Sequence, residues 1–162
     1  MLVDGLGYVK ICDYGLAKFL PLGGRTSTFL GTLAYMPPEA IASEPYDHGT
    51  DLWGLAISLF EMLFGSTPFE PNSLLSEQEW RNATKQNILG GNLRFPYSNA
   101  RATLPARLFL KSMLDIRPED RLHAPNLAHH KVCDLIFEFQ IRMYQILSVG
   151  CAASDRYFFV PY

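Results

Sequence analysis

The longest apolar run of the chain covers residues 52–64, follows Asp51 and contains only Gly54, Ser58 and Glu61 as interruptions, in the sequence DLWGLAISLFEMLF. In a helix these residues would place apolar side chains on every side, a pattern typical of a helix that is buried all round. Gly65 and Pro68 follow it as a C-cap glycine and a helix breaker would. The apolar run of residues 52–64 is too short to span a bilayer. The pattern therefore predicts a buried helix over residues 51–64.

Three further stretches have a helical pattern. Residues 76–89 predict a moderately polar helix that ends at Gly90 and Gly91. Residues 132–147 repeat apolar side chains at i, i+3, i+4 and i+7, for which we favour packing on the rest of the fold over binding a partner. Residues 104–114 predict a helix whose core positions are Leu104, Leu108, Leu110, Met113 and Leu114.

The first twelve residues read as a β-hairpin. Two short apolar stretches flank Asp4 and Gly5, a pair that favours a tight turn. Val9 and Ile11 share one face of the second strand, which leads directly to Asp13. The pattern therefore predicts an acidic side chain where a strand opens into a loop.

Composition narrows the class of protein. Apolar residues make up 48% of the chain and charged residues 19%, which is typical of a globular protein. The formal charge of −2 shows no excess of basic residues, so nothing in the composition indicates a protein that binds nucleic acid. The three cysteines, Cys12, Cys133 and Cys151, are far apart and suit a reducing compartment better than a disulfide framework. The start of the chain lacks the pattern of a signal peptide, so we expect a cytoplasmic location, with the nucleus as an alternative.

Residues 13–39 carry four markers in a fixed order. Asp13-Tyr14-Gly15 comes first, a loop with Arg25-Thr26-Ser27-Thr28 follows, then Gly31-Thr32, and finally Pro37-Pro38-Glu39. This stretch resembles the activation segment of a protein kinase. The Arg-Thr-x-Thr spacing is similar to that of the cyclic-nucleotide-dependent branch of the AGC serine/threonine kinases.

The resemblance implies a mainly α fold: the C-lobe of a protein kinase, that is, part of a protein kinase-like fold, with one short N-terminal β-hairpin. It covers residues 1–132, with residues 51–64 as the central helix. Residues 133–162, a predicted helix and an aromatic tail, carry little of it. A kinase also has a Gly-rich loop, a strand Lys, a helix Glu, and a catalytic loop with a base Asp and a metal-binding Asn. None of these patterns occurs in the 162 residues.

Within this resemblance, Asp13 would chelate Mg²⁺ bound to the ATP phosphates. The alternative is a carboxylate that caps a turn. Thr28 matches the activation phosphosite, with Lys18 as one partner of the phosphate. Thr26 and Ser27 remain alternative acceptors, and a plain polar loop remains an equal alternative.

The resemblance also implies residues that face a peptide substrate. Thr32 resembles the threonine that contacts the catalytic Asp. Glu61 matches a carboxylate that reads a basic substrate residue, against the alternative of a solvated helix edge. Leu33 and Ala34 stand where relatives have Pro-Glu, which puts part of a preference for basic substrates in doubt. The expected apolar pocket beside the phosphoacceptor consists of Phe29, Leu33 and Met36.

Three residues are expected to have structural roles. Arg121 should pair with Glu39 in a buried bidentate ion pair that fixes the end of the activation segment. Asp51 would accept hydrogen bonds from the catalytic-loop backbone in a whole kinase, so we expect it to have lost its partners here.

The implied reaction is transfer of the ATP γ-phosphoryl group to a Ser or Thr hydroxyl, with ATP and Mg²⁺ as cofactors and with a protein substrate and an upstream activating kinase as partners. Because the Lys, the base and the second metal ligand are missing from the sequence, we expect this chain alone to be inactive. The alternative is a non-catalytic module of kinase-like fold that docks peptides or partners.

Overall fold

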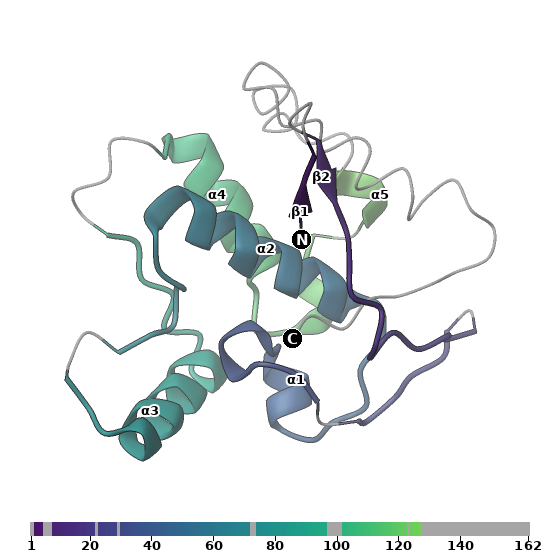
Figure 1. The fold of residues 1–162 in the computed structure, drawn as a ribbon, viewed down its shortest axis with the longest axis horizontal. Helices are drawn as coiled ribbons and strands as arrows, with labels where there is room; N and C mark the ends of the chain where they lie inside the picture. The colour runs from purple at the N-terminus through teal and green to yellow at the C-terminus, as the bar shows by residue number, and fades with distance from the viewer. Residues whose placement is uncertain are drawn as a thin grey trace.

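The computed structural model describes residues 2–4, 8–21, 23–28, 30–71, 74–96, 102–122 and 124–127. The described chain is mostly helical, and the helices gather around one long helix, α2 (Figure 1). Residues 128–162 lie outside the described part, so the predicted helix over 132–147 and the aromatic tail stay predictions. Of the described helices, none combines the length and the hydropathy needed to cross a membrane.

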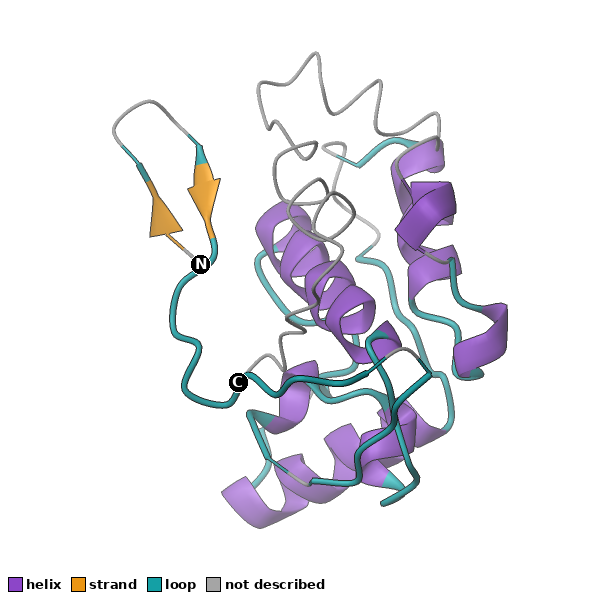
Figure 2. Ribbon diagram, turned by 90° about the vertical axis from the view of Figure 1, so that its right-hand side faces the viewer, coloured by secondary structure: helices purple, strands orange, loops and turns teal. Residues whose placement is uncertain are grey.

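Two short strands begin the chain. β1 (Leu2–Val3) pairs antiparallel with β2 (Val9–Lys10), with Leu2 opposite Lys10. Beside this ladder, Lys10 forms a 3.3 Å ion pair with Asp4. Residues 5–7, which join the strands, lie outside the described part, so the predicted turn stays a prediction. The strands stand to one side of the helices in Figure 2.

The helix α2 (Gly49–Phe64) begins two residues before the predicted start. Asp47 explains this, because its Oδ1 accepts the Gly49 N–H at 2.8 Å and its carbonyl accepts the Thr50 hydroxyl at 3.0 Å. The predicted end is confirmed. Gly65 adopts the left-handed region with φ of 79°, and its N–H donates to the Glu61 carbonyl at 2.7 Å.

The burial of α2 differs from the prediction. Trp53, Ile57 and Phe60 are fully buried, but Leu55 is only half-buried and Met62 is 57% exposed. The expectation of a helix buried all round is therefore wrong. Among the described elements, the principal contacts of α2 are with α4 and with the short turn η1, which cover one side of the helix and leave Met62 open.

The helix α3 (Glu77–Leu89) has the predicted bounds to within one residue. Ser76 is its N-cap in a capping box: the Ser76 side chain accepts the Glu79 N–H at 3.4 Å, and Glu79 Oε2 accepts the Ser76 N–H at 3.0 Å. Gly90 ends the helix and Gly91 follows with φ of 61°, so the predicted glycine stop is confirmed.

The helix α4 (Leu104–Met113) is confirmed, but its predicted core face is partly wrong. Leu110, Met113 and Leu114 are buried as predicted, whereas Leu104 is 68% and Leu108 is 56% exposed. The helical period explains the difference, because Leu104 and Leu108 lie on the side of the helix opposite Leu110 and Met113. The spacing of the apolar residues was helical, but they belong to two faces.

Four short elements complete the described fold: the 3-10 turns η1 (Leu33–Tyr35) and η2 (Pro118–Asp120), and the helices α1 (Pro38–Ile41) and α5 (Ala124–Leu127). One core joins α2 to α3, α4 and α5. Its buried members are Trp53, Ala56, Ile57, Leu59, Phe60, Phe69, Ile88, Phe109, Leu110, Met113, Leu114 and Leu127.

Candidate functional site

Glu39 and Arg121 form the predicted ion pair. Arg121 Nη1 donates to Glu39 Oε1 and Nη2 donates to Oε2, each at 2.6 Å, and the two side chains are only 2% and 5% exposed. Nε donates to the Asp115 carbonyl at 2.8 Å and Nη2 also donates to the Ile116 carbonyl at 3.2 Å. The guanidinium lies 4.9 Å from the centre of the Trp53 ring.

These contacts attach the end of residues 13–39 to the helical core. Glu39 belongs to α1, Arg121 follows η2, and Trp53 belongs to α2, so three separate parts of the chain meet at one guanidinium. Two charges in such a dry place are stable only as a well-bonded pair. Removing one partner alone would leave the other charge buried without compensation.

The loop that carries Thr26 and Thr28 is attached at a second point. Thr26 and Tyr46 exchange two backbone hydrogen bonds of 2.9 and 2.8 Å, and the Tyr46 hydroxyl donates to the Thr28 carbonyl at 2.5 Å. Lys18 Nζ donates to Thr26 Oγ1 at 2.9 Å, and the two threonine hydroxyls lie 3.2 Å apart. A hollow of about 240 Å³ adjoins these four side chains.

The alternative acceptors differ in access. Thr26 is buried, whereas Ser27 and Thr28 are exposed. The structure therefore brings Lys18 close to the expected phosphosite, although its hydrogen bond is to Thr26 rather than to Thr28.

Asp13 lies at the open end of the segment. Its φ is 65°, a left-handed conformation that Asp adopts more readily than most residues, and its side chain is exposed. Oδ1 accepts the Gly15 N–H at 3.3 Å, which is the turn-capping contact of the alternative interpretation. The neighbouring Tyr14 is 59% exposed and its hydroxyl donates to the Ile11 carbonyl at 3.3 Å.

Asp13 fits a magnesium ion only in part. In the described part of the chain, no three His, Cys, Asp or Glu side chains gather as metal ligands would. Mg²⁺ demands an octahedron of oxygens, of which one carboxylate supplies a single corner. The described residues therefore do not by themselves make a magnesium site.

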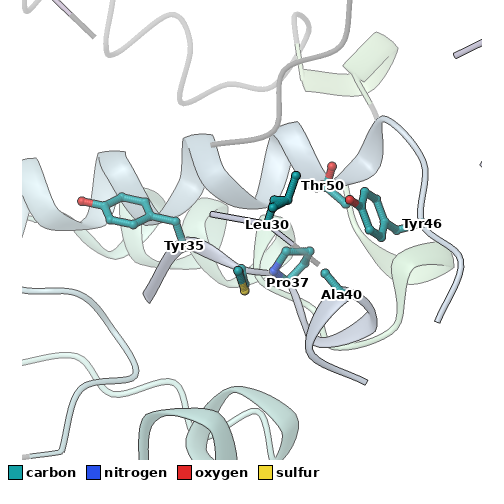
Figure 3. A pocket seen from close by; sticks show the side chains of 7 residues that line it. Leu30, Tyr35, Pro37, Ala40, Tyr46 and Thr50 are labelled. Carbon is teal, nitrogen blue, oxygen red and sulfur yellow. The ribbon is translucent and has the colours of Figure 1, made fainter. Parts of the chain in front are cut away.

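The residues expected to face a substrate are described only in part, so the pocket of Phe29, Leu33 and Met36 stays a prediction. Thr32 is exposed and precedes η1, while Leu33 and Met36 are buried. Met36 lines a cavity of about 10 Å³, enclosed by residues from Leu30 to Thr50 and shown in Figure 3, and Leu33 does not reach it. Phe29 lies outside the described residues. Of the two described members, both are buried, and only Met36 borders this cavity.

Glu61 is exposed on α2 and accepts a hydrogen bond from the Tyr35 hydroxyl. Burial, together with the hydrogen bond and charge of Glu61 and the charge of Glu70, raises the pKa of Tyr35 to about 12. Tyr35 points away from the cavity, at the end opposite Tyr46 (Figure 3). Sequence reasoning missed Tyr35, because nothing local links it to a residue 26 positions away.

Asp51 lies half-buried in the first turn of α2. Asp51 interacts with its surroundings, and the expected loss of its hydrogen bonds to a catalytic loop stays a prediction. Burial of the Tyr46 ring and then the charge of Asp51 raise the pKa of Tyr46. The carboxylate therefore acts on the same tyrosine that holds the loop of Thr26 and Thr28.

Comparison with known proteins agrees with the resemblance. Residues 1–133 match the protein kinase domain. The chain belongs to the protein kinase family. The similar kinases include serine/threonine-protein kinase sck2 of Schizosaccharomyces pombe, 36% identical over 76% of this chain and 18% of that protein. Others are cAMP-dependent protein kinase type 3 of Saccharomyces cerevisiae, 36% identical over 59% of this chain and 22% of that protein, and serine/threonine-protein kinase akt-1 of Caenorhabditis elegans, 34% identical over 75% and 21%.

These relatives are serine/threonine kinases and include members of the AGC group. This kinase-family chain spans about a fifth of the length of each of them.

Proposed function

We propose that this chain forms part of the C-lobe of a serine/threonine protein kinase, a lobe that holds the activation segment and faces the protein substrate. The observation that carries the proposal is the attachment of residues 13–39 to the core through Glu39 and Arg121. The contact attaches the segment that carries Thr28 and Thr32 to the helical core, and such fixed positioning supports recognition of a substrate and regulation by a phosphate.

The finer assignment is to the cyclic-nucleotide-dependent branch. It rests on Arg25-Thr26-Ser27-Thr28 and on the 36% identity with the yeast cAMP-dependent kinase. Thr28 is then the phosphorylated residue, Lys18 a partner of the phosphate, and Glu61 the carboxylate that reads a basic residue of the substrate. An upstream kinase would modify Thr28, and the cytoplasm or nucleus is the proposed location.

We further propose that the 162-residue chain alone does not transfer phosphate. ATP and Mg²⁺ would be cofactors of a whole kinase, in which Asp13 supplies one metal ligand. Phosphoryl transfer depends on positioning and on charge neutralisation by several groups at once. A single exposed carboxylate does not provide these.

A chimera tests the kinase assignment. The part of the yeast cAMP-dependent kinase that aligns with this chain is replaced by the chain, and folding is checked by thermal unfolding. The proposal predicts phosphorylation of a basic peptide by the chimera, its loss on Asp13→Ala, and its retention on Asp4→Ala as a matched control. A folded chimera without activity would contradict the assignment.

The mass of the native protein tests the C-lobe assignment separately. Mass spectrometry of the protein from its source cells would detect peptides of residues 132–147 in a species far heavier than 18.3 kDa if the lobe is part of a whole kinase. Detection of an 18.3 kDa species alone would contradict it.

The second candidate is a docking module of kinase-like fold. The exposed Leu104 and Leu108, which lie one turn apart on the same face of α4, favour it, because adjoining apolar side chains that stay open to water are typical of contact sites. Thermal unfolding with and without Mg·ATP separates the two candidates in the chimera, since a docking lobe gives no stabilisation that Asp13→Ala removes.

A further inference from the structure

We propose that Tyr46 is the positioning residue of the activation segment: it clamps Thr26 and Thr28 to the loop before α2 and so leaves the Thr28 side chain, and not that of Thr26, open to a modifying enzyme. The regulatory meaning of this clamp rests on the proposed function, whereas the clamp itself is a property of the chain.

The clamp consists of three hydrogen bonds from one residue. Two are the reciprocal backbone bonds with Thr26, 2.9 and 2.8 Å long, and the third runs from the Tyr46 hydroxyl to the Thr28 carbonyl at 2.5 Å. Because the backbone pair and the hydroxyl bond reach residues two apart, they fix the direction of the chain between them as well as its position. The segment is therefore held at both Thr26 and Thr28.

Burial protects these bonds from water. Tyr46 is 5% exposed and Thr26 is 8% exposed. The tyrosine ring borders two spaces, the cavity of about 10 Å³ beside Thr50 and the hollow of about 240 Å³ beside Lys18. Figure 3 shows Tyr46 beside Thr50 at the first of these spaces.

The two threonine side chains held by the clamp differ in their access to solvent. The Thr26 hydroxyl is buried, accepts a hydrogen bond of 2.9 Å from the Lys18 ammonium and lies 3.2 Å from the Thr28 hydroxyl. Thr28 is held by its carbonyl, and its side chain is exposed, with its hydroxyl sharing the 3.2 Å hydrogen bond with that of Thr26. An enzyme that modifies a hydroxyl needs access to it, which the clamp gives to Thr28 and withholds from Thr26.

The loop that provides Tyr46 also begins α2. Asp47, the next residue, accepts the Gly49 N–H and the Thr50 hydroxyl in the first turn of that helix. A displacement of Thr26 and Thr28 would therefore be transmitted through two consecutive residues to the start of the central helix.

Trypsin cleavage after Arg25 tests the clamp, because the bond it cuts is the one to the paired nitrogen of Thr26. The full chain is used, and cleavage after Arg25 is measured relative to cleavage after the exposed Arg94. Proteolysis of a locally opened segment follows the population of the open form. We expect Tyr46→Phe to raise the ratio about three- to tenfold, the effect of losing one hydrogen bond. Tyr35→Phe, which removes a hydroxyl bonded elsewhere, leaves the ratio unchanged.

An unchanged ratio in Tyr46→Phe would overturn the proposal. So would equal acceleration at both sites, since that is the effect of a residue that only stabilises the whole fold. Hydrogen exchange of the unmodified chain provides a test without a variant: the amides of Thr26 and Tyr46 should exchange more slowly than that of Ser27. Equal exchange of the three amides would also overturn the proposal. Neither measurement depends on kinase activity, so failure of the clamp and failure of the proposed function are told apart.

Discussion

The two ends of residues 13–39 differ in how they are held. At the Glu39 end, a buried guanidinium makes two bonds to a carboxylate and two to backbone carbonyls, and lies over a tryptophan ring. At the Asp13 end, an exposed carboxylate makes one local contact of 3.3 Å to Gly15. The first end uses residues up to 82 positions apart, and the second uses neighbours.

This contrast separates the part of residues 13–39 that is attached to the core from the part proposed to hold a metal ion. The described residues attach the Glu39 end to the core through Arg121. The acidic group expected to hold a metal ion stands without a second ligand group in that same part of the chain. The resemblance to the kinase family therefore covers both ends of residues 13–39, whereas the two ends differ in the contacts that hold them.

The largest effect is expected from breaking the buried pair. Arg121→Ala should lower the free energy of unfolding by about 3–5 kcal/mol, because the Glu39 carboxylate would stay buried without its partner. Arg117→Ala is the matched control, since Arg117 forms an exposed pair with Asp120 that is worth about 0–1 kcal/mol. Urea unfolding of both variants measures the difference, and similar midpoints would break the comparison.

Packing near the Glu39 end should give the next largest effect. Met36 is 5% exposed, so Met36→Ala is expected to cost about 2–5 kcal/mol through lost burial and a new cavity. Leu30 borders the same cavity but is 45% exposed, and Leu30→Ala should cost clearly less. Equal losses in urea unfolding would mean that the buried Met36 contributes no more to the free energy of unfolding than the exposed Leu30.

Tyr35 gives the segment a dependence on pH. Its pKa of about 12 in the folded chain exceeds the ordinary value of 10.0, so the folded state holds this proton more tightly. The contribution to stability is fully present below about pH 10 and is lost as pH rises toward about 12. Because the hydroxyl is largely solvated, we expect about 1 kcal/mol or less.

Urea unfolding at about pH 9 and about pH 11 checks this dependence. Tyr35→Phe should remove the part of the alkaline loss that belongs to this hydroxyl. An identical loss in the variant would mean that Glu61 and Tyr35 are not coupled.

The smallest effect is expected at the open end. Asp13→Ala removes one exposed turn contact and should change the free energy of unfolding by about 1 kcal/mol or less. Circular dichroism during urea unfolding would detect a larger change. A loss comparable to that of Arg121→Ala would contradict the idea that the two ends are held differently.

Local signals predicted the helices well. Gly65 marks the end of α2, and Ser76 with Glu79 marks the start of α3, because caps are made by residues close in sequence. Family resemblance, rather than spacing, located the Glu39–Arg121 pair. The helical period places Leu104 and Leu108 opposite Leu110 and Met113, but it could not tell which of these two faces of α4 is buried, since that depends on the neighbouring elements.

Long-range hydrogen bonds left no signal in the sequence. Tyr46 reaches Thr28 across 18 positions and Tyr35 reaches Glu61 across 26. No pattern of residues around either tyrosine indicates its hydrogen-bond partner. The open side of α2 at Met62 could not be foreseen either, because burial depends on which elements pack against a helix.

The central proposal is that this kinase-family chain supplies the scaffold of a kinase lobe and does not by itself transfer phosphate. The most direct test is transfer of labelled γ-phosphate from Mg·ATP to a basic Ser/Thr peptide by the purified 162-residue chain and by its Asp13→Ala variant. The account predicts that both give the same background signal. Turnover by the unmodified chain that disappears in Asp13→Ala would contradict it.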